Sequence, residues 1–577
     1  MTGPSTSNLD RMVKSTIARL SGGLSPVALL GAYSDWALNL AASPGKQIEL
    51  IEKAAAQATK LLRYAGHHAL DPESDAPAPA VPSKGDHRFD DPAWKRYPFN
   101  LFEQSFLLTE QWWQEATTGV RGATQANLNV VSFITRQMLD MVAPTNFIPT
   151  NPVVLEQTVV QGGANLVRGI QNYLEDEGRK LAHEKPASDH FEVGRNLAVT
   201  PGKVILRNRL IELIQYSPTT KEVHAEPILF VPAWIMKYYI LDLSQTNSMV
   251  KYLVDRGHTV FMISWKNPDE GDRDLGFEDY LNLGIKAALD AVSAVVPGQK
   301  IHAAGYCLGG TLLSIAASAM ARDHDDRLAS VTLFAAQTDF TEPGEIALFI
   351  NESQVTFLED MMWQRGFLET GQMAGAFQLL RSNDLIWSRL IHDYLLGQRE
   401  DMMDLMAWNA DATRMPYRMH TQYLRRLFLE NALAQAHFKV DDRVIALTDI
   451  RCPIFAVGTV TDHVAPWRSV FKIIQLTDTD VTFLLTNGGH NAGIVAGPEN
   501  PHRNYQIAYH GANDTHVEPE TWAATMPHHQ GSWWPAWAEW LEKLQAGHAL
   551  VAPPPMGAAD AGYAPVCKAP GTYVHQA

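Results

Sequence analysis

A cysteine at the centre of a G-x-C-x-G pattern is the residue of this sequence best suited to covalent catalysis. Cys307 lies between an apolar run with strand character at Ile301–Tyr306 and helical spacing at Gly310–Ala321. A nucleophile on such a strand-turn-helix is strained and exposed, and glycines on either side let strand and helix approach closely. Taken alone, the pattern also fits a small, buried packing residue. Catalysis therefore requires a base and an acid elsewhere in the chain.

The sequence offers both groups directly after strand-like runs. Asp462 follows Ile454–Val457, and His490 lies in a glycine-rich stretch after Thr482–Leu485. A cysteine nucleophile needs a base, and the base needs an orienting group. The chain order Cys307, Asp462, His490 matches the α/β-hydrolase scheme, in which loops at one edge of a sheet bring the three residues together. We predict a Cys-His-Asp catalytic triad.

Other residues of the same types are weaker candidates. Asp339 follows the strand expected after the nucleophile and is a second possible acid. His463 would point away from the site if its neighbour Asp462 points inward, so we interpret it as structural. Cys452, at a strand start, is interpreted as a core residue, and Cys567 as a free thiol of the tail without a catalytic role.

Two backbone N–H groups are predicted to stabilise the oxyanion of an acyl-transfer intermediate. Leu308 opens the helix after the nucleophile, so its N–H is free and the helix N-terminus adds partial positive charge. A second donor is expected from the loop after an earlier strand. In Val231–Tyr239 the N–H of Ile235 is the preferred donor, and Pro232 is excluded because it has no N–H.

Short strand-like runs alternate with helical runs after residue 200. This alternation predicts a mainly parallel sheet covered on both faces, with the first two runs as an antiparallel edge. We predict an α/β-hydrolase fold for a catalytic domain at 201–577, with a helical cap insertion at about 340–440. The expected strands are 203–207, 211–216, 228–231, 260–265, 301–306, 331–335, 454–457 and 482–485, and the expected helices are 248–256, 277–296 and 310–321.

The first 200 residues are predicted to form a separate, mainly helical domain. Apolar residues recur at helical spacing over residues 9–66. A stretch rich in Pro, Ala and Ser at about 71–85 is too poor in large apolar residues to pack, so we predict a linker there. No set of residues in this region has catalytic spacing. We expect it to support assembly or surface contacts and not chemistry.

Composition excludes several classes of function. The 577 residues carry a formal net charge of −16, which disfavours nucleic acid as a partner. The three cysteines have no C-x-x-C or His-rich spacing, so we predict no disulfide framework, no metal site and no cofactor. The N-terminus lacks the pattern of a signal peptide and no apolar run reaches about 18 residues. We expect a cytoplasmic protein without a transmembrane span.

On these residues the chain resembles the poly(3-hydroxyalkanoate) synthases, most closely the class with a single type of subunit. The resemblance rests on G-Y-C-L-G-G at 305–310, T-D-H-V-A-P-W at 461–467 and G-G-H at 488–490. Tyr306 and Asn491 differ from the residues often found at their positions in the family, so the preferred monomer stays open. Further matching segments lie at 86–94, 144–152, 191–202, 234–243, 265–269 and 531–537.

The resemblance implies an acyltransferase that polymerises (R)-3-hydroxyacyl-CoA into polyester with release of CoA. Cys307 would carry the acyl group as a thioester and His490 would take the thiol proton. Asp462 would either orient His490 or act on the incoming 3-hydroxyl, and we expect the second role. The cap would exclude water from the acyl-enzyme. The implied partners are the acyl-CoA substrate, the growing polyester, the granule surface and a second copy of the chain in a homodimer.

Two other functions remain open from the sequence. A cysteine hydrolase, such as a dienelactone hydrolase or a thioesterase, shares G-Y-C-L-G-G but not the long helical N-terminal region or so large an insertion. A non-catalytic protein of the granule coat would carry amphipathic repeats and no ordered triad. Release of CoA followed together with the formation of polymer separates the three functions.

Overall fold

The computed structural model describes residues 4–21, 23–71, 74, 76–83, 85–182, 190–372, 386–399 and 402–577. Its contacts divide the chain into two compact units. The larger unit comprises residues 1–20, 187–374 and 402–577, and the smaller comprises residues 21–186 and 375–401. Each unit is therefore built from segments that are distant in the sequence.

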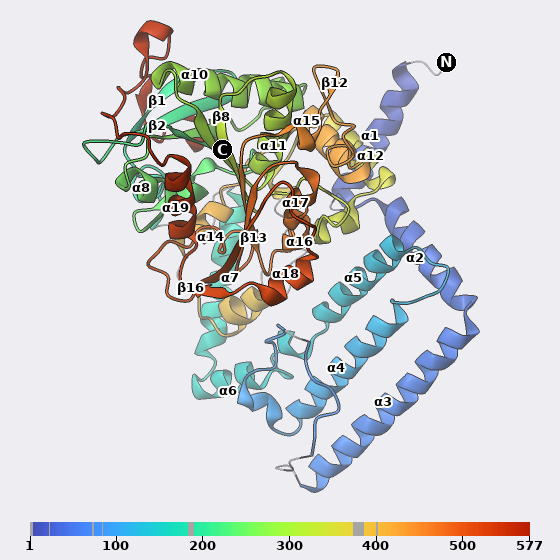
Figure 1. Ribbon diagram of the computed structural model, residues 1–577. Coiled ribbons are helices and arrows are strands. Elements are labelled where there is room, and N and C mark those ends of the chain that lie inside the picture. The colour runs from blue at the N-terminus through green and yellow to red at the C-terminus, as the bar shows by residue number, and fades with distance from the viewer. Residues whose placement is uncertain are drawn as a thin grey trace. The chain divides into compact units, whose positions relative to one another are not determined.

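The larger unit is built, within its described residues, on an 11-stranded sheet in the order β16-β15-β14-β13-β8-β7-β3-β6-β2-β1-β17 (Figure 1). The strands from β14 to β6 run parallel, and the strands beyond them on both sides pair antiparallel. The bounds are β1 (Gly202–Arg207), β2 (Ile211–Tyr216), β3 (Ile228–Val231), β6 (Val260–Trp265), β7 (Ile301–Tyr306), β8 (Leu328–Phe334), β13 (Ile454–Thr459), β14 (Val481–Thr486), β15 (Asn504–His510), β16 (His528–Gln530) and β17 (Cys567–Lys568).

Helices cover both faces of this sheet, which explains why the strands β3, β6, β7 and β13 are buried at every position. In β3, Leu229 and Val231 belong to one apolar cluster, while Ile228 and Phe230 belong to another, as the two-residue period of a strand requires. The first cluster includes side chains of η5, α10, α11, α16 and α17, and the second includes side chains of α8 and α19. These helices are α8 (Met249–Asp255), η5 (Tyr280–Lys286), α10 (Ala287–Val295), α11 (Leu308–Arg322), α16 (Trp467–Phe471), α17 (Ile473–Leu476) and α19 (Trp534–Leu544).

The predicted α/β-hydrolase fold is confirmed. All eight expected strands form, and the helices expected at 248–256, 277–296 and 310–321 begin and end within about two residues of those bounds, the second as α9 (Phe277–Asp279), η5 and α10 in succession. The outer strands β15, β16 and β17 were not predicted from the sequence. The last is only two residues long and pairs Lys203 with Lys568, so it has too few residues to show a pattern.

The region between β8 and β13 is largely helical, as predicted. Residues 373–385, 400 and 401 of this region lie outside the described residues. Its elements in the larger unit are η6 (Glu345–Phe349), α12 (Glu352–Trp363), β9 (Phe367–Leu368), α14 (Asp404–Asn409), β10 (Met415–Pro416), α15 (Tyr417–Tyr423), η9 (Leu424–Leu429), β11 (Lys439–Val440), β12 (Arg443–Val444) and η10 (Leu447–Asp449).

The N-terminal helix α1 (Pro4–Leu20) packs on α12 within the larger unit. Lys14 Nζ lies 3.3 Å and Arg11 Nε 3.8 Å from the two carboxylate oxygens of Asp360. The Arg11 guanidinium also stacks over the Trp363 ring at 5.5 Å. The start of the chain therefore contributes directly to the unit that carries the sheet.

The smaller unit is helical in all of its longer elements. Its core includes the buried side chains of Phe89, Trp94 and Phe106, and beside them Arg88 pairs with Asp86, Glu110 and the buried Asp140. The longer elements are α2 (Pro26–Ala41), α3 (Pro44–Leu70), α4 (Phe99–Ala116), α5 (Gln125–Met141), α6 (Pro152–Val160), α7 (Ala164–Leu181) and η8 (Leu390–Leu395). In the described part of the chain, no helix combines the length and apolarity needed to cross a bilayer.

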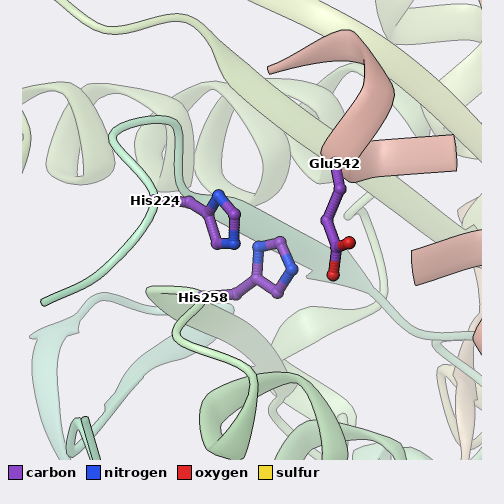
Figure 2. Close-up of side chains that lie close together, drawn as sticks. All are labelled: His224, His258 and Glu542. Carbon is purple, nitrogen blue, oxygen red and sulfur yellow. The ribbon is translucent and has the colours of Figure 1, made fainter. Parts of the chain in front are cut away.

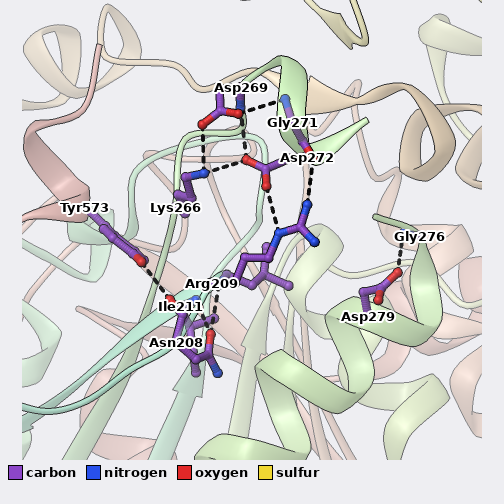
Figure 3. Close-up of polar contacts among 11 residues, drawn as sticks. Asn208, Arg209, Ile211, Lys266, Asp269, Gly271, Asp272, Gly276, Asp279 and Tyr573 are labelled. Atoms are coloured by element: carbon purple, nitrogen blue, oxygen red, sulfur yellow. Dashed lines mark hydrogen bonds and ion pairs between the residues drawn. The ribbon is translucent and has the colours of Figure 1, made fainter. Parts of the chain in front are cut away.

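A buried carboxylate fixes the loop after β6 (Figure 3). Asp272, 2 % exposed, accepts hydrogen bonds from Lys266 Nζ at 2.6 Å and from Arg209 Nε at 3.2 Å. Its Oδ2 also accepts from the N–H of Asp269 at 3.1 Å. The preceding Trp265 donates from Nε1 to the carbonyl of Pro232 at 2.9 Å. The end of β6, where this loop begins, is thus bonded to the segment that follows β3.

Removal of the Asp272 carboxylate tests this arrangement. Asp272→Ala should lower the free energy of unfolding by about 2–3 kcal/mol, because charge-assisted hydrogen bonds to two cations are lost. Asp269 is the matched control, because its carboxylate pairs with the same lysine, Lys266, but its side chain is 60 % exposed. Asp269→Ala should cost less than about 1 kcal/mol. Urea denaturation measures both changes, and equal losses would contradict the structural role of Asp272.

Candidate active site

Cys307 lies on a strained turn between β7 and α11. Its φ of 52° and ψ of −126° fall outside the favoured regions for a residue with a side chain. Such a conformation costs about 1–3 kcal/mol and persists only where neighbouring structure enforces it. The Cys307 N–H donates to the carbonyl of Phe334 on β8 at 2.9 Å. The backbone at the nucleophile is therefore held from the adjacent strand.

Glycines make this turn possible. A Cβ on Gly309 would lie 2.0 Å from the carbonyl oxygen of Val231, and one on Gly305 would lie 2.4 Å from the Cα of Gly310. Both distances are far below a van der Waals contact, and the neighbours are backbone atoms that cannot move aside. The first turn of α11 is thus pressed against β7 and against the end of β3, as the sequence pattern predicted.

His490 and Asp462 meet in the loops that follow β14 and β13. His490 Nδ1 lies 2.7 Å from Asp462 Oδ2, and the two side chains are 10 % and 0 % exposed. Parallel pairing of β13 with β14 brings the ends of both strands to the same edge of the sheet. Residues that are distant in sequence therefore form a buried pair where the sequence analysis expected one.

The carboxylate of Asp462 is saturated with donors. Oδ1 accepts from the N–H groups of Val464 and Ala465, each at 2.8 Å, and Oδ2 accepts from Thr459 Oγ1 at 3.0 Å as well as facing His490. Burial opposes the charged form, but the positive charge of His490 and these hydrogen bonds outweigh it and lower the pKa of Asp462. The carboxylate is therefore fixed and ionised at neutral pH.

Cys307 is the third member of this group. Burial favours the neutral form of the His490 imidazole, but the charges of Asp462 and Cys307 and the hydrogen bond to Asp462 raise the pKa of His490 well above its ordinary value of 6.5. When His490 takes the proton of Cys307, the product is an imidazolium beside a thiolate, which is the nucleophilic form of a cysteine. The buried carboxylate of Asp462 can orient this pair.

The two expected oxyanion donors occupy different surroundings. Leu308 is the first residue of α11, so its N–H has no acceptor within the helix. Ile235 lies in the buried loop after β3, where its carbonyl accepts from the N–H of Thr413 at 3.1 Å. Thr413 Oγ1 also donates to the carbonyl of Trp234 at 3.0 Å. The inserted region between β8 and β13 thus holds the loop that carries Ile235.

The structure places the weaker candidates for catalytic residues in surroundings apart from the group of Cys307, His490 and Asp462. Asp339 accepts from the N–H of Thr341 at 2.8 Å and from Lys472 Nζ at 3.2 Å. Burial raises the pKa of Cys452 to about 11, which leaves it a neutral thiol. Cys567 lies on β17, where Arg207 Nη2 is 3.3 Å from its sulfur. The backbone carbonyl of His463 accepts from the N–H of Glu345.

The structure adds neighbours that sequence spacing could not reveal. The Tyr306 ring lies 5.5 Å from the His490 ring, and its hydroxyl donates to Asn491 Oδ1 at 2.5 Å. Asn491 Nδ2 in turn donates to Asn409 Oδ1 at 3.2 Å, at the end of α14. Tyr423 of α15 is close enough for the Cys307 thiolate to contribute to the raised pKa of its hydroxyl, after burial. The inserted region therefore borders the triad.

Comparison with known proteins places the chain in a family. A family model described as the N-terminus of poly-beta-hydroxybutyrate polymerase (PhaC) matches residues 85–253, and one described as the N terminal of that polymerase matches residues 4–46. A model of the alpha/beta hydrolase fold matches residues 226–496. A poly(3-hydroxyalkanoate) polymerase of Methylorubrum extorquens is 41% identical, over 85% of this chain and 81% of its own length. The poly(3-hydroxyalkanoate) polymerase subunit PhaC of Rhizobium meliloti is 37% identical, over 86% of this chain and 80% of its own length. The same subunit of Cupriavidus necator is 35% identical, over 85% of this chain and 83% of its own length.

These matches confirm the resemblance read from the motifs around Cys307, Asp462 and His490. The chain belongs to the family of poly(3-hydroxyalkanoate) polymerases, which are acyltransferases.

Proposed function

We propose that this enzyme polymerises (R)-3-hydroxyacyl-CoA into polyester and releases CoA, with Cys307 as the covalent carrier. The observation that carries the proposal is that His490 contacts Asp462 at 2.7 Å and lies near enough to Cys307, at the strained turn, for the charge of the sulfur to raise the pKa of His490. A thioester substrate and a thiolate nucleophile suit each other, because acyl transfer from one sulfur to another costs little free energy.

Acylation begins when the Cys307 thiolate attacks the thioester carbonyl. The oxyanion that forms is stabilised by the N–H groups of Leu308 and Ile235. As the intermediate collapses, the bond to the CoA sulfur breaks and His490 gives the leaving thiolate the proton that it took from Cys307. The products are free CoA and an acyl group bound to Cys307 as a thioester.

Extension joins this acyl group to the hydroxyl of a second monomer. His490, now neutral, takes the hydroxyl proton while the alkoxide attacks the thioester of Cys307. The carbon-sulfur bond breaks, an ester bond forms, and Cys307 returns as a thiolate beside the imidazolium. The lengthened acyl-CoA then acylates Cys307 again and releases its CoA. Formation of the oxygen ester makes this sequence downhill.

We propose the orienting role for Asp462. Its side chain is fully buried, and both of its oxygens already have partners. Oδ1 accepts hydrogen bonds from Val464 and Ala465, while Oδ2 accepts one from Thr459 and faces His490. An incoming hydroxyl would have to displace one of these donors. The saturated carboxylate supports orientation of His490 over direct activation of the monomer.

We propose that the partners are the acyl-CoA, the growing polyester, the granule surface and a second copy of the chain, at granules in the cytoplasm. Exposed apolar side chains on the helices of the smaller unit support a surface role for that unit. Sedimentation with polymer granules and analytical ultracentrifugation test these contacts. The side chains include Val27, Leu30, Leu38, Ile48, Ile51 and Leu62.

Cys307 is predicted to be acylated during turnover. Brief exposure to (R)-3-hydroxybutyryl-CoA followed by peptide mass spectrometry should find a 3-hydroxyacyl adduct on Cys307, and Cys307→Ala should abolish CoA release. Cys452→Ala is the matched control and should retain the adduct on Cys307. The thiol that this substitution removes is neutral and distant from His490. Adduct on Cys452 or Cys567 with Cys307 unmodified would refute the assignment, and CoA release without polymer would indicate a hydrolase.

Asp462→Asn is predicted to slow acylation and extension alike. Both steps use the same histidine, and loss of the carboxylate removes the charge that stabilises its imidazolium. The same substitution in a serine-protease triad lowers kcat by about 10⁴-fold, and we expect a loss of that order. Rapid-quench measurement of the first CoA burst and of steady turnover gives the two rates. A burst at the native rate followed by failed extension would instead assign Asp462 to the incoming hydroxyl.

The raised pKa of His490 predicts a pH window for thiol reactivity. Its proton stabilises the fold fully below 6.5, and this contribution is lost as the pH rises through the raised pKa. At pH 6 we expect iodoacetamide to alkylate Cys307 about tenfold or more faster in the native enzyme than in His490→Gln. The difference should shrink at alkaline pH.

Cys452 provides the internal control for this measurement. Its pKa of about 11 predicts slow alkylation at the same pH values in both proteins. Peptide mass spectrometry resolves the two sites. Equal alkylation of Cys307 at pH 6 with and without His490 would show that no imidazolium-thiolate pair exists.

A further inference from the structure

Three potential metal ligands converge at the edge of the sheet where the parallel strands begin. His224 precedes β3, His258 precedes β6, and Glu542 lies near the end of α19. Figure 2 shows the two imidazoles face to face, with the Glu542 carboxylate beside His258. One ligand atom of each residue lies within 4.8 Å of the other two. Nothing in the proposed polymerisation uses this cluster.

His258 is the unusual member. It is 1 % exposed, and neither Nδ1 nor Nε2 has a hydrogen-bond partner among the described residues. Its ring stacks on His224 at 4.4 Å between centroids, with an interplanar angle of 15°. Burial of two polar nitrogens without partners is costly, and native proteins satisfy nearly all such groups. A ligand that uses an imidazole lone pair would remove this cost.

Acidic side chains and one arginine surround the cluster. A neutral imidazole has a lone pair to donate to a metal cation. Glu542 pairs with Arg256, and Glu226 pairs with His302 at 3.0 Å and lies 3.8 Å from His548. Glu539 adds a further acidic charge near Arg256.

We propose that His224, His258 and Glu542 form a binding site for one Zn²⁺ ion. Two imidazole nitrogens and a carboxylate oxygen are a common zinc ligand set, and a water molecule would complete a tetrahedron. Imidazole donors disfavour Ca²⁺ and Mg²⁺, which prefer oxygen ligands. Ligand atoms around zinc lie about 3.3 Å apart, so the cluster must contract.

The site has the freedom to make this adjustment. His224 is only partly buried, so its ring can turn from the stacked position to point its lone pair at the ion. The Glu542 side chain is 36 % exposed, and its two hydrogen bonds from Arg256 use the same oxygen, Oε1. Oε2 therefore stays available to the metal, and solvent can reach the site from this side.

Zinc here would stabilise the fold and take no part in catalysis. The ion would tie the segments before β3 and β6 to the C-terminal part of α19. Cys307 follows the end of β7, which runs parallel to β3, so the nucleophile and the cluster lie at opposite edges of the sheet. The expected consequence of binding is a higher unfolding temperature.

Zinc binding is tested on the full chain without an affinity tag, in the Cys307→Ala background. That background removes the thiolate beside His490, which could itself bind zinc. Equilibrium dialysis with metal analysis should find about one Zn²⁺ per chain, and zinc should raise the unfolding temperature by roughly 2 °C or more. Mg²⁺ should do neither.

Substitutions assign the binding to the cluster. Both His258→Ala and Glu542→Gln should abolish the bound zinc and the thermal shift, and Glu542→Gln retains an oxygen for Arg256 in case His258→Ala fails to fold. His528→Ala, on the exposed strand β16, is the matched control and should retain both. Absence of zinc from the Cys307→Ala protein, or zinc that persists in folded Glu542→Gln, would overturn the proposal. Either result leaves the proposed polymerisation untouched.

Discussion

Close approach of backbone at the turn between β7 and α11 is the constraint on which the rest of the catalytic unit depends. The positive φ of Cys307 is maintained because its N–H is bound to β8 and because the helix packs directly on Val231. No side chain fits at Gly305 or Gly309 without displacing backbone. The sheet must therefore be rigid around this turn. The parallel strands β3 and β7, buried at every position, and β8, buried at all positions but Ala329, supply that rigidity.

Electrostatics at the site follow from burial. In water the pair of His490 and Asp462 would gain little, but both side chains are almost fully enclosed. The donors around Asp462 offset the cost of burying its charge and hold it in one orientation. In the acyl transfer that we propose, the imidazole carries a proton between sulfur, oxygen and the leaving thiol. The same fixed carboxylate can serve every step of a repeating reaction.

The loops at the two ends of the parallel strands, which lie along opposite edges of the sheet, have different roles. At one edge, loops carry the proposed nucleophile, base and acid, and the inserted region adds Asn409 and Tyr423 beside them. At the other edge, the segments that enter the strands bring the buried His258 and the partly buried His224 together, and the proposed acyl transfer does not use them. Because strands fix the positions of both ends, changes in one set of loops need not disturb the other. This separation allows stability and chemistry to reside in different residues of one sheet.

Local pattern in the sequence was sufficient for the strands, the turn at Cys307 and the order of Cys307, Asp462 and His490, because strand period and glycine spacing are short-range properties. The outer strands β15 to β17 were not predictable, since edge pairing is set by distant partners such as Lys203 and Lys568. Tertiary structure alone decided that Thr459, Val464 and Ala465 saturate Asp462 and that His224, His258 and Glu542 converge. Those contacts join residues through folded loops, and no spacing along the chain encodes which side chains a sheet brings face to face.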